Sequence, residues 1–173
     1  GKAHIQSFEE KYQVLARQNP SLKLAKPELQ DEGMTAVFPY LEGKTRAELL
    51  GEILTAQGAD AEVSAIRAAM DEIYSIRPEE RKPFAVTPEF IKVFNALGEL
   101  DSYRDKETEN GGGWASLGAV LADESYSASN IDALFENMLV TADGTYAIDY
   151  EWVFLFPVPA GFVKYRTLVY FYR

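Results

Sequence analysis

Three oxygen-bearing side chains in the last third of the chain have the types and spacing of a metal and phosphate site. Asp132 and Asn137 are five residues apart, and Asp149 follows at the start of an acidic, aromatic stretch. Carboxylate and amide oxygens are hard ligands, which favour magnesium over zinc. A carboxylate beside such a metal can also accept the proton of an attacking hydroxyl. The chain therefore carries the parts of a site for phosphate chemistry, if its fold brings the three residues together.

A β-hairpin is predicted to position two of these residues. The tripeptide Ala142-Asp143-Gly144 is typical of a three-residue hairpin loop, with glycine at the position that requires a positive φ. The flanking runs 138–141 and 145–148 are then antiparallel strands. Both runs are short and apolar, which suits a hairpin packed against a core.

The predicted register of this hairpin brings the candidate ligands together. If Thr141 faces Thr145, counting outward places Asn137 opposite Asp149, with Cβ atoms roughly 4.5 to 5.5 Å apart. Asp132 precedes Asn137 by a short loop that can fold back over the same place. We therefore predict that the three side chains converge at the open end of the hairpin.

The same stretch resembles the catalytic segment of protein-kinase-like phosphotransferases, particularly the aminoglycoside and choline kinase branch. That branch has the pattern His-x-Asp-x-x-x-x-Asn, then a short hairpin, then Ile-Asp-Phe or Ile-Asp-Trp-Glu. The residues here are Asn130-Ile131-Asp132, Asn137 and Ile148-Asp149-Tyr150-Glu151. The resemblance implies that Asp132 accepts the proton of the substrate hydroxyl, while Asn137 and Asp149 hold the Mg²⁺ ions that bridge the phosphates of ATP. Asn130 departs from the pattern, because the family has a histidine there.

A second stretch, residues 34–50, resembles the strand, hinge and following helix that link the two lobes in this branch. There an apolar strand ends in Tyr-Leu-Glu-Gly, as at Tyr40-Leu41-Glu42-Gly43 here. The resemblance implies that the backbone of Tyr40 and Leu41 hydrogen-bonds an adenine. Upstream, apolar residues recur at helical spacing, as in the C helix of the small lobe: Ile5, Phe8, Tyr12 and Leu15.

Together the two stretches predict an α+β fold of the kinase-like type. We expect a mostly helical C-lobe with a hinge strand and a catalytic-loop β-hairpin, and an incomplete small lobe. Residues 1–173 form one kinase-like domain fragment in this interpretation, with 1–38 a remnant of the small lobe, 39–43 the hinge and 44–173 the large lobe. Nothing before residue 5 supplies the Gly-rich loop or the strand lysine of such enzymes. We therefore expect a larger parent chain with further domains, and a fragment that is inactive alone.

Local signals between the hinge and the catalytic segment predict helices. Thr45 with Glu48 forms a capping box, and Asp60 is a candidate cap for the next helix. Thr87 precedes a proline, which suits the first position of a further helix. The polar, Gly-rich segment from Asp101 to Gly113 is the best candidate for a mobile loop.

Composition excludes several classes of protein. The net charge of −10, with 17 scattered Lys and Arg residues, argues against a nucleic-acid partner. The absence of cysteine excludes a disulfide scaffold and a thiol nucleophile, and it fits the reducing cytoplasm, where we expect the protein. The most apolar stretch, residues 153–172, includes Lys164, Arg166 and two prolines, so we expect no membrane span.

Simpler interpretations of several residues stay open. Asp132 taken alone can cap a local turn. Glu151 and Trp152 are typical of a structural charge and a core aromatic. His4, the single histidine, has no predicted partner, which argues against histidine-based acid–base catalysis.

Two functions follow from the sequence. In the first, the protein transfers the phosphoryl group of Mg-ATP to a hydroxyl of a small molecule or sugar. In the second, it is a catalytically degenerate kinase-like accessory domain of a multidomain glycosyltransferase or methyltransferase in bacterial surface-polysaccharide synthesis. Residues 148–159 resemble segments of such enzymes.

Overall fold

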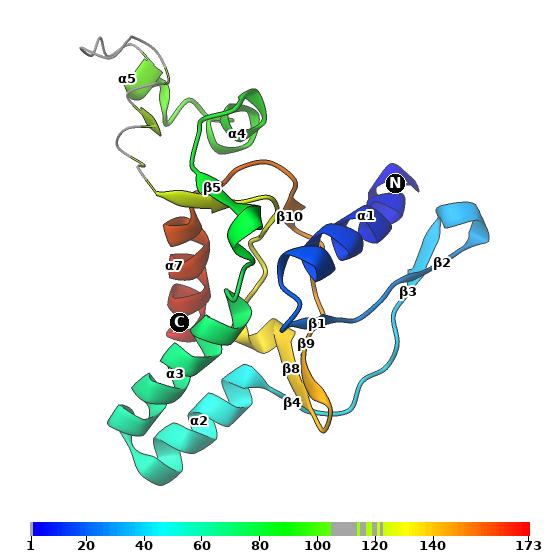
Figure 1. Ribbon diagram of the computed structural model, residues 1–173, viewed down its shortest axis with the longest axis vertical. Coiled ribbons are helices and arrows are strands. Elements are labelled where there is room, and N and C mark those ends of the chain that lie inside the picture. Colours follow the sequence, from blue (N-terminus) through cyan, green and yellow to red (C-terminus); the bar gives the residue numbers. More distant parts are fainter. Residues whose placement is uncertain (1, 105–113, 115–116, 119–120, 122) are drawn as a thin grey trace.

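The protein has a mixed α+β fold, described by a computed structural model for residues 2–104, 114, 117–118, 121 and 123–173 (Figure 1). The α-helices described are α1 (Lys2–Gln18), α2 (Arg46–Gln57), α3 (Ala59–Ile73), α4 (Pro88–Phe94), α5 (Asp101–Arg104) and α7 (Ala160–Phe171). The strands described are β1 (Lys23–Leu24), β2 (Glu28–Gln30), β3 (Thr35–Val37), β4 (Lys44–Thr45), β5 (Arg81–Pro83), β6 (Glu124–Tyr126), β7 (Ser129–Asn130), β8 (Met138–Thr141), β9 (Gly144–Ala147) and β10 (Val153–Phe154).

Helix starts follow the local capping signals at two of the three predicted places. The Thr45 side chain accepts a hydrogen bond from Glu48 N at 3.2 Å, and the Glu48 carboxylate accepts one from Thr45 N at 2.7 Å, which confirms the capping box of α2. At α4 the Thr87 side chain accepts a hydrogen bond from Phe90 N at 3.2 Å, which caps the helix without a reciprocal bond. The prediction that Asp60 caps a helix is wrong, because α3 begins at Ala59 and Gly58 is its N-cap. Asp60 lies instead in the first turn, where a negative charge complements the helix dipole.

The central sheet has four strands in the order β1-β9-β8-β4. The β8–β9 hairpin is present, but its register differs by one residue from the prediction. Thr141 pairs with Gly144 rather than Thr145, so the loop holds two residues. Asn137 therefore lies opposite Ile148, whose N–H donates to the Asn137 carbonyl at 3.0 Å. Direct pairing of Asn137 with Asp149 is the part of the prediction that is wrong.

Two distant segments complete this sheet. β1 follows α1 and pairs in parallel with β9, whereas β4 precedes α2 and pairs antiparallel with β8. The Lys23 ammonium at the end of β1 also forms an ion pair with Asp143 in the hairpin loop, at 3.0 Å. The hairpin is thus held at both edges and at its tip, so its open end has a fixed position.

The buried side chains form three clusters. The largest lies between α2, α3, α7 and the hairpin, and includes Leu50, Phe135 and Met138. A second lies under α1, where the rings of Phe8 and Tyr150 meet edge to face at 6.0 Å. The third packs α4 against neighbouring loops. No helix in the described part of the chain is long and apolar enough to cross a membrane.

The segment predicted as a mobile loop is described only at its start. Asp101–Arg104 forms the short helix α5. Residues 105–113, including the three consecutive glycines, lie outside the described residues.

Candidate functional site

Asp132 and Asn137 lie at the two ends of a tight loop between β7 and β8. The Asn137 side-chain N–H donates to the Asp132 carbonyl at 3.0 Å, which closes the loop. The Asn130 side-chain oxygen accepts from Asp132 N, also at 3.0 Å. Asn130, which stands where the kinase pattern has histidine, therefore supports the loop directly. The loop folds back as predicted, but Asn137 contacts the backbone carbonyl of Asp132 and not its carboxylate.

The Asp132 carboxylate is largely buried, with 8% of the residue exposed. Arg166 of α7 approaches it, with 3.3 Å between Nη2 and Oδ1. Burial raises the pKa of the Asp132 carboxyl, the hydrogen bond from Arg166 lowers it by less, and the negative charge of Asp149 raises it again. The net direction is upward, which makes the carboxylate a stronger proton acceptor.

Asp149 lies two residues beyond the end of β9 and is exposed. One carboxylate oxygen, Oδ1, accepts from Glu151 N at 3.2 Å, which fixes the orientation of the group. Because Met138 pairs with Ala147, Asp149 lies at the same open end of the hairpin as Asn137. The three residues therefore lie at one end of the hairpin, but within the described residues no contact joins the Asp149 side chain to Asp132 or to Asn137.

Two side-chain oxygens at this end accept no hydrogen bond from the described part of the chain. Asn137 uses its amide nitrogen to bond Asp132, so its Oδ1 is left with no hydrogen-bond donor from the described part of the chain. The same holds for Oδ2 of Asp149. Within the described residues no group of three or more His, Asp or Glu side chains is placed to hold a metal. A cation here would therefore depend on the amide of Asn137 as well as on carboxylates.

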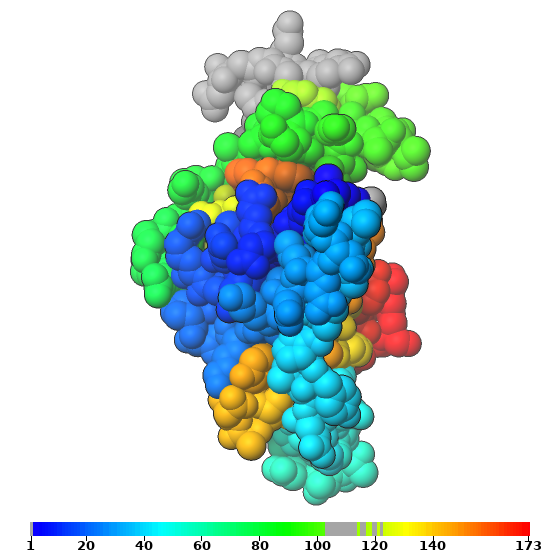
Figure 2. Space-filling model, turned by 90° about the vertical axis from the view of Figure 1, so that its right-hand side faces the viewer, coloured from blue at the N-terminus to red at the C-terminus, as the bar shows by residue number. Residues whose placement is uncertain are grey.

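The predicted hinge connects β3 to β4 and lies beside the hairpin, where the cyan segment adjoins the orange strands (Figure 2). Tyr40 is 93% exposed, and Leu41 is partly buried. In the described part of the chain, no hydrogen bond engages the backbone of either residue. Just upstream, the ring of Phe38 meets that of Tyr150, next to Asp149, at 5.9 Å. The hinge is thus linked to the carboxylate site through one aromatic contact.

Gly43, at the end of the hinge, lies so close to the backbone of β8 that a side chain would not fit there. Its backbone does not have a positive φ, so conformational freedom does not explain the glycine. A Cβ atom added there would overlap the carbonyl oxygen of Val140 in β8. The glycine of the Tyr-Leu-Glu-Gly pattern therefore allows residues 39–43 to pack against the β8–β9 hairpin.

We expect Gly43→Ala to lower the free energy of unfolding by about 1–3 kcal/mol, because the added methyl group forces β4 away from β8. Gly51→Ala is the matched control: it lies inside α2, a Cβ there meets no atom within 4 Å, and alanine should stabilise the helix by about 0.5–1 kcal/mol. Urea unfolding of both variants measures the difference. Equal effects of the two changes would contradict the close-approach explanation.

Residues of α1 also contact the segment after Asp149, which sequence reasoning missed. His4 Nε2 lies 2.9 Å from the Glu151 carboxylate, and the Lys11 ammonium donates to the Glu151 carbonyl at 2.5 Å. The expectation that His4 lacks a partner is wrong, and Glu151 is a structural charge as predicted. Trp152 is 58% exposed, so its assignment as a core aromatic is wrong. These contacts join residues about 140 positions apart, so no local sequence pattern predicts them.

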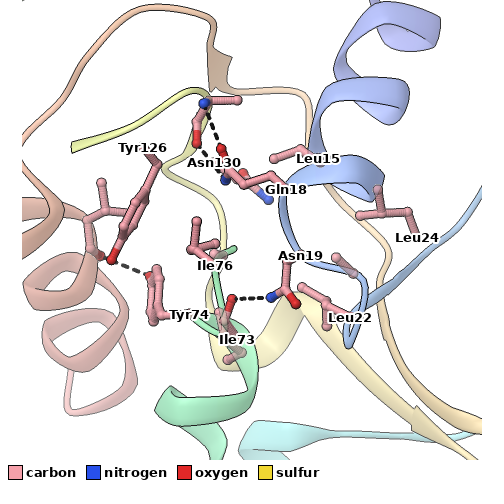
Figure 3. A pocket seen from close by; sticks show the side chains of 14 residues that line it. Leu15, Gln18, Asn19, Leu22, Leu24, Ile73, Tyr74, Ile76, Tyr126 and Asn130 are labelled. Carbon is pink, nitrogen blue, oxygen red and sulfur yellow. Dashed lines mark hydrogen bonds between the residues drawn. The ribbon is translucent and has the colours of Figure 1, made fainter. Parts of the chain in front are cut away.

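An enclosed pocket of about 40 Å³ lies behind the loop (Figure 3). It has room for water but not for a nucleotide. Gln18 and Asn19, at the end of α1, reach into it. Gln18 bonds both the N–H and the carbonyl of Ala128, at 2.8 and 2.9 Å, and Asn19 donates to the Ile73 carbonyl at 2.8 Å. These amides anchor α1 to α3 and to the strand that leads into the catalytic loop.

We expect Gln18→Leu to lower the free energy of unfolding by about 2–4 kcal/mol, because it leaves two buried backbone groups of Ala128 without partners. Gln13→Leu in the same helix is the control, since Gln13 is exposed and bonds only the Glu9 side chain. Chemical denaturation compares the two variants. A Gln18→Leu protein as stable as Gln13→Leu would show that the paired hydrogen bonds contribute nothing.

Comparisons of the chain with protein-family models, with curated proteins and with solved structures find no match in any of the three. The assignment of a function therefore depends on the residues and contacts described above.

Proposed function

We propose that this protein binds Mg-ATP and transfers its terminal phosphoryl group to a hydroxyl of a small molecule or sugar. The observation that supports the proposal is the tight loop in which the Asn137 side chain donates to the Asp132 carbonyl at 3.0 Å. The register of the hairpin leaves Asp149 at the same open end as this loop. The resemblance to kinase-like phosphotransferases assigns the same three residues to catalysis.

Asp132 acts as the general base in this proposal. Its burial and its pKa, raised above the usual carboxyl value, suit a group that must take a proton from a weakly acidic hydroxyl. The Asn130 and Asn137 side chains hold the loop on either side of it. Such support would keep the Asp132 carboxylate in a fixed orientation toward the acceptor hydroxyl.

Asn137 and Asp149 would hold the metal through their side-chain oxygens Oδ1 and Oδ2. A bound Mg²⁺ would neutralise charge on the phosphates. The contact from Glu151 N fixes the Asp149 carboxylate, and the bond to the Asp132 carbonyl fixes the Asn137 amide, so both oxygens have set positions. The backbone of Tyr40 and Leu41 would receive the adenine, because its polar groups are not used within the described part of the protein.

Thermal unfolding of the full-length protein tests this function. A ligand that binds only the native state stabilises it by RT ln(1 + [L]/Kd), so ATP and Mg²⁺ together should raise Tm. ATP alone and Mg²⁺ alone should have much smaller effects. Equal Tm values with and without Mg-ATP, at millimolar ligand, would overturn the proposal.

A second candidate function is a degenerate kinase-like accessory domain in a glycosyltransferase or methyltransferase. The ion pair between Asp132 and Arg166 favours it, because a buried carboxylate that is already paired can have a purely structural role. This candidate predicts that Asp132→Asn lowers stability and that the natural protein consumes no ATP with any hydroxyl compound. ATP turnover by the natural protein would exclude it.

A further inference from the structure

A pocket of about 340 Å³ lies between α4 and the first turn of α7. We call it the α4–α7 pocket. Its wall is apolar except for Asp123, and the apolar side chains are those of Phe90, Phe94, Leu121, Val158, Pro159 and Phe162. The volume falls within the range of about 300–1,000 Å³ that is usual for pockets that bind small molecules. None of the three candidate catalytic residues lines this pocket, so the proposed phosphoryl transfer does not use it.

Two phenylalanine rings in this wall meet at a right angle. The rings of Phe94 and Phe162 have their centroids 5.7 Å apart and an interplanar angle of 85°. Phe90 stacks on the other side of this pair, with its ring centroid 4.7 Å from that of Phe94. Aromatic rings attract one another in offset-stacked and edge-to-face arrangements. A flat ring placed in this corner can therefore stack on one phenylalanine and meet the other edge to face.

The single charge in the wall is the Asp123 carboxylate, and backbone groups fix its orientation. Oδ2 accepts from Gly161 N at 2.6 Å, and Oδ1 accepts from Glu124 N at 2.8 Å. No lysine, arginine or histidine in the described part of the chain pairs with it. Each carboxylate oxygen can accept a further hydrogen bond. The carboxylate is thus held in place at the pocket, with its charge not matched by a cation of the chain.

This charge selects the polar group of a ligand. An anionic group would be repelled by Asp123, whereas an ammonium group provides three N–H donors and the opposite charge. The net charge of −10 also favours the approach of cations over anions. The wall therefore matches a molecule with an aromatic body and an ammonium group.

We propose that the α4–α7 pocket binds a small aromatic amine, with the ring between Phe94 and Phe162 and the ammonium group on Asp123. This binding site is separate from the proposed nucleotide site and does not depend on it. Binding of the amine should therefore require neither ATP nor Mg²⁺.

Calorimetric titration of the natural protein with four probes tests the ligand class. Phenethylamine has both features, 2-phenylethanol is neutral, 3-phenylpropionate is anionic, and 2-cyclohexylethylamine keeps the ammonium group without an aromatic ring. We expect phenethylamine to bind about three- to tenfold more tightly than 2-phenylethanol, because solvent partly screens the exposed carboxylate. The anion and the cyclohexyl amine should both bind more weakly than phenethylamine.

Two variants assign the contacts. Asp123→Asn keeps an oxygen for Gly161 N and removes the charge, so it should abolish the preference for the amine over the alcohol. Asp60→Asn is the matched control, because it removes the same charge from an exposed aspartate in the first turn of another helix. Phe162→Leu changes a partly exposed side chain, so the fold should persist. It should weaken phenethylamine binding and abolish the preference for the aromatic ring over the cyclohexyl ring.

The ranking of probes by the natural protein decides the proposal even if a variant fails to fold. Absence of saturable phenethylamine binding, or equal affinity for the amine and the alcohol, would overturn it. A preference that survives Asp123→Asn, or that Asp60→Asn removes as well, would also overturn it, since the charge of Asp123 would then not be the cause. Because the titration contains no nucleotide, its outcome leaves the proposed function unaffected.

Discussion

Replacing Asp132 by asparagine should lower kcat by about 10²–10⁴-fold and leave the affinity for Mg-ATP nearly unchanged. The substitution keeps the size of the side chain and an oxygen that can still face Arg166. It removes the negative charge that takes the proton of the acceptor. Steady-state kinetics with a competent acceptor give kcat, and equilibrium binding gives the affinity.

The pH dependence of the natural enzyme provides a second measure of the same residue. If Asp132 is the general base that we propose, kcat/KM should fall as the pH drops through the pKa of its carboxyl. Because burial raises that pKa, the fall should lie at a higher pH than for an ordinary aspartate. Arg166 lowers the pKa of Asp132, so Arg166→Gln should move the fall to still higher pH.

Glu136→Gln is the control for Asp132→Asn, since Glu136 lies in the same loop and is exposed. It removes one negative charge near the site and should leave kcat nearly unchanged. An Asp132→Asn enzyme with full turnover would show that Asp132 is not the base. Equal losses in both variants would assign the effect to the charge of the loop as a whole.

Phe135→Ala should lower the free energy of unfolding by about 3–5 kcal/mol, the range for deleting a fully buried aromatic ring. Phe135 is 0% exposed and lies between Asp132 and Asn137 in the catalytic loop. Its ring meets that of Phe171 in α7 edge to face at 5.4 Å. The substitution would leave a cavity where the loop, the hairpin and α7 meet.

Urea unfolding measures this loss, and Leu97→Ala provides the comparison because Leu97 is 87% exposed. That control should change stability by no more than about 0.5 kcal/mol. If Phe135→Ala is as stable as Leu97→Ala, the loop is not anchored by its core contact.

The features that the sequence predicts best depend on neighbouring residues. The capping box at Thr45 and Glu48 and the start of α4 at Thr87 involve hydrogen bonds across three residues, so the local pattern determines them. The helical spacing of Phe8 and Leu15 likewise predicts α1, which buries both residues.

The register of the β8–β9 hairpin could not be predicted from neighbouring residues alone. Gly144 has the positive φ that the pattern predicts, yet it pairs with Thr141 instead of occupying the loop. A change of one residue reverses which side of a strand each residue faces, so turn chemistry alone could not place Asn137 relative to Asp149. The pairing of β8 with β4 and of β9 with β1 fixes the register, and these partners are far away in sequence.

The surroundings of the candidate site depend on contacts between distant residues. Arg166 reaches Asp132 from 34 positions away, and His4 reaches Glu151 across 147 positions. No motif marks either contact, because each depends on how α7 and α1 pack against the sheet. Sequence spacing therefore selects the candidate residues but does not predict the charges that surround them.

Calorimetric titration of Mg-ATP into the full-length protein and its Asp149→Asn variant tests the central claim most directly. Asp149 is exposed, so the substitution removes a metal ligand and little packing, and Glu136→Gln again controls for charge. We predict saturable binding that requires Mg²⁺, is retained in Glu136→Gln and is lost in Asp149→Asn. Binding that is equally strong in Asp149→Asn, or no binding by the natural protein, would contradict a metal–nucleotide site at this end of the hairpin.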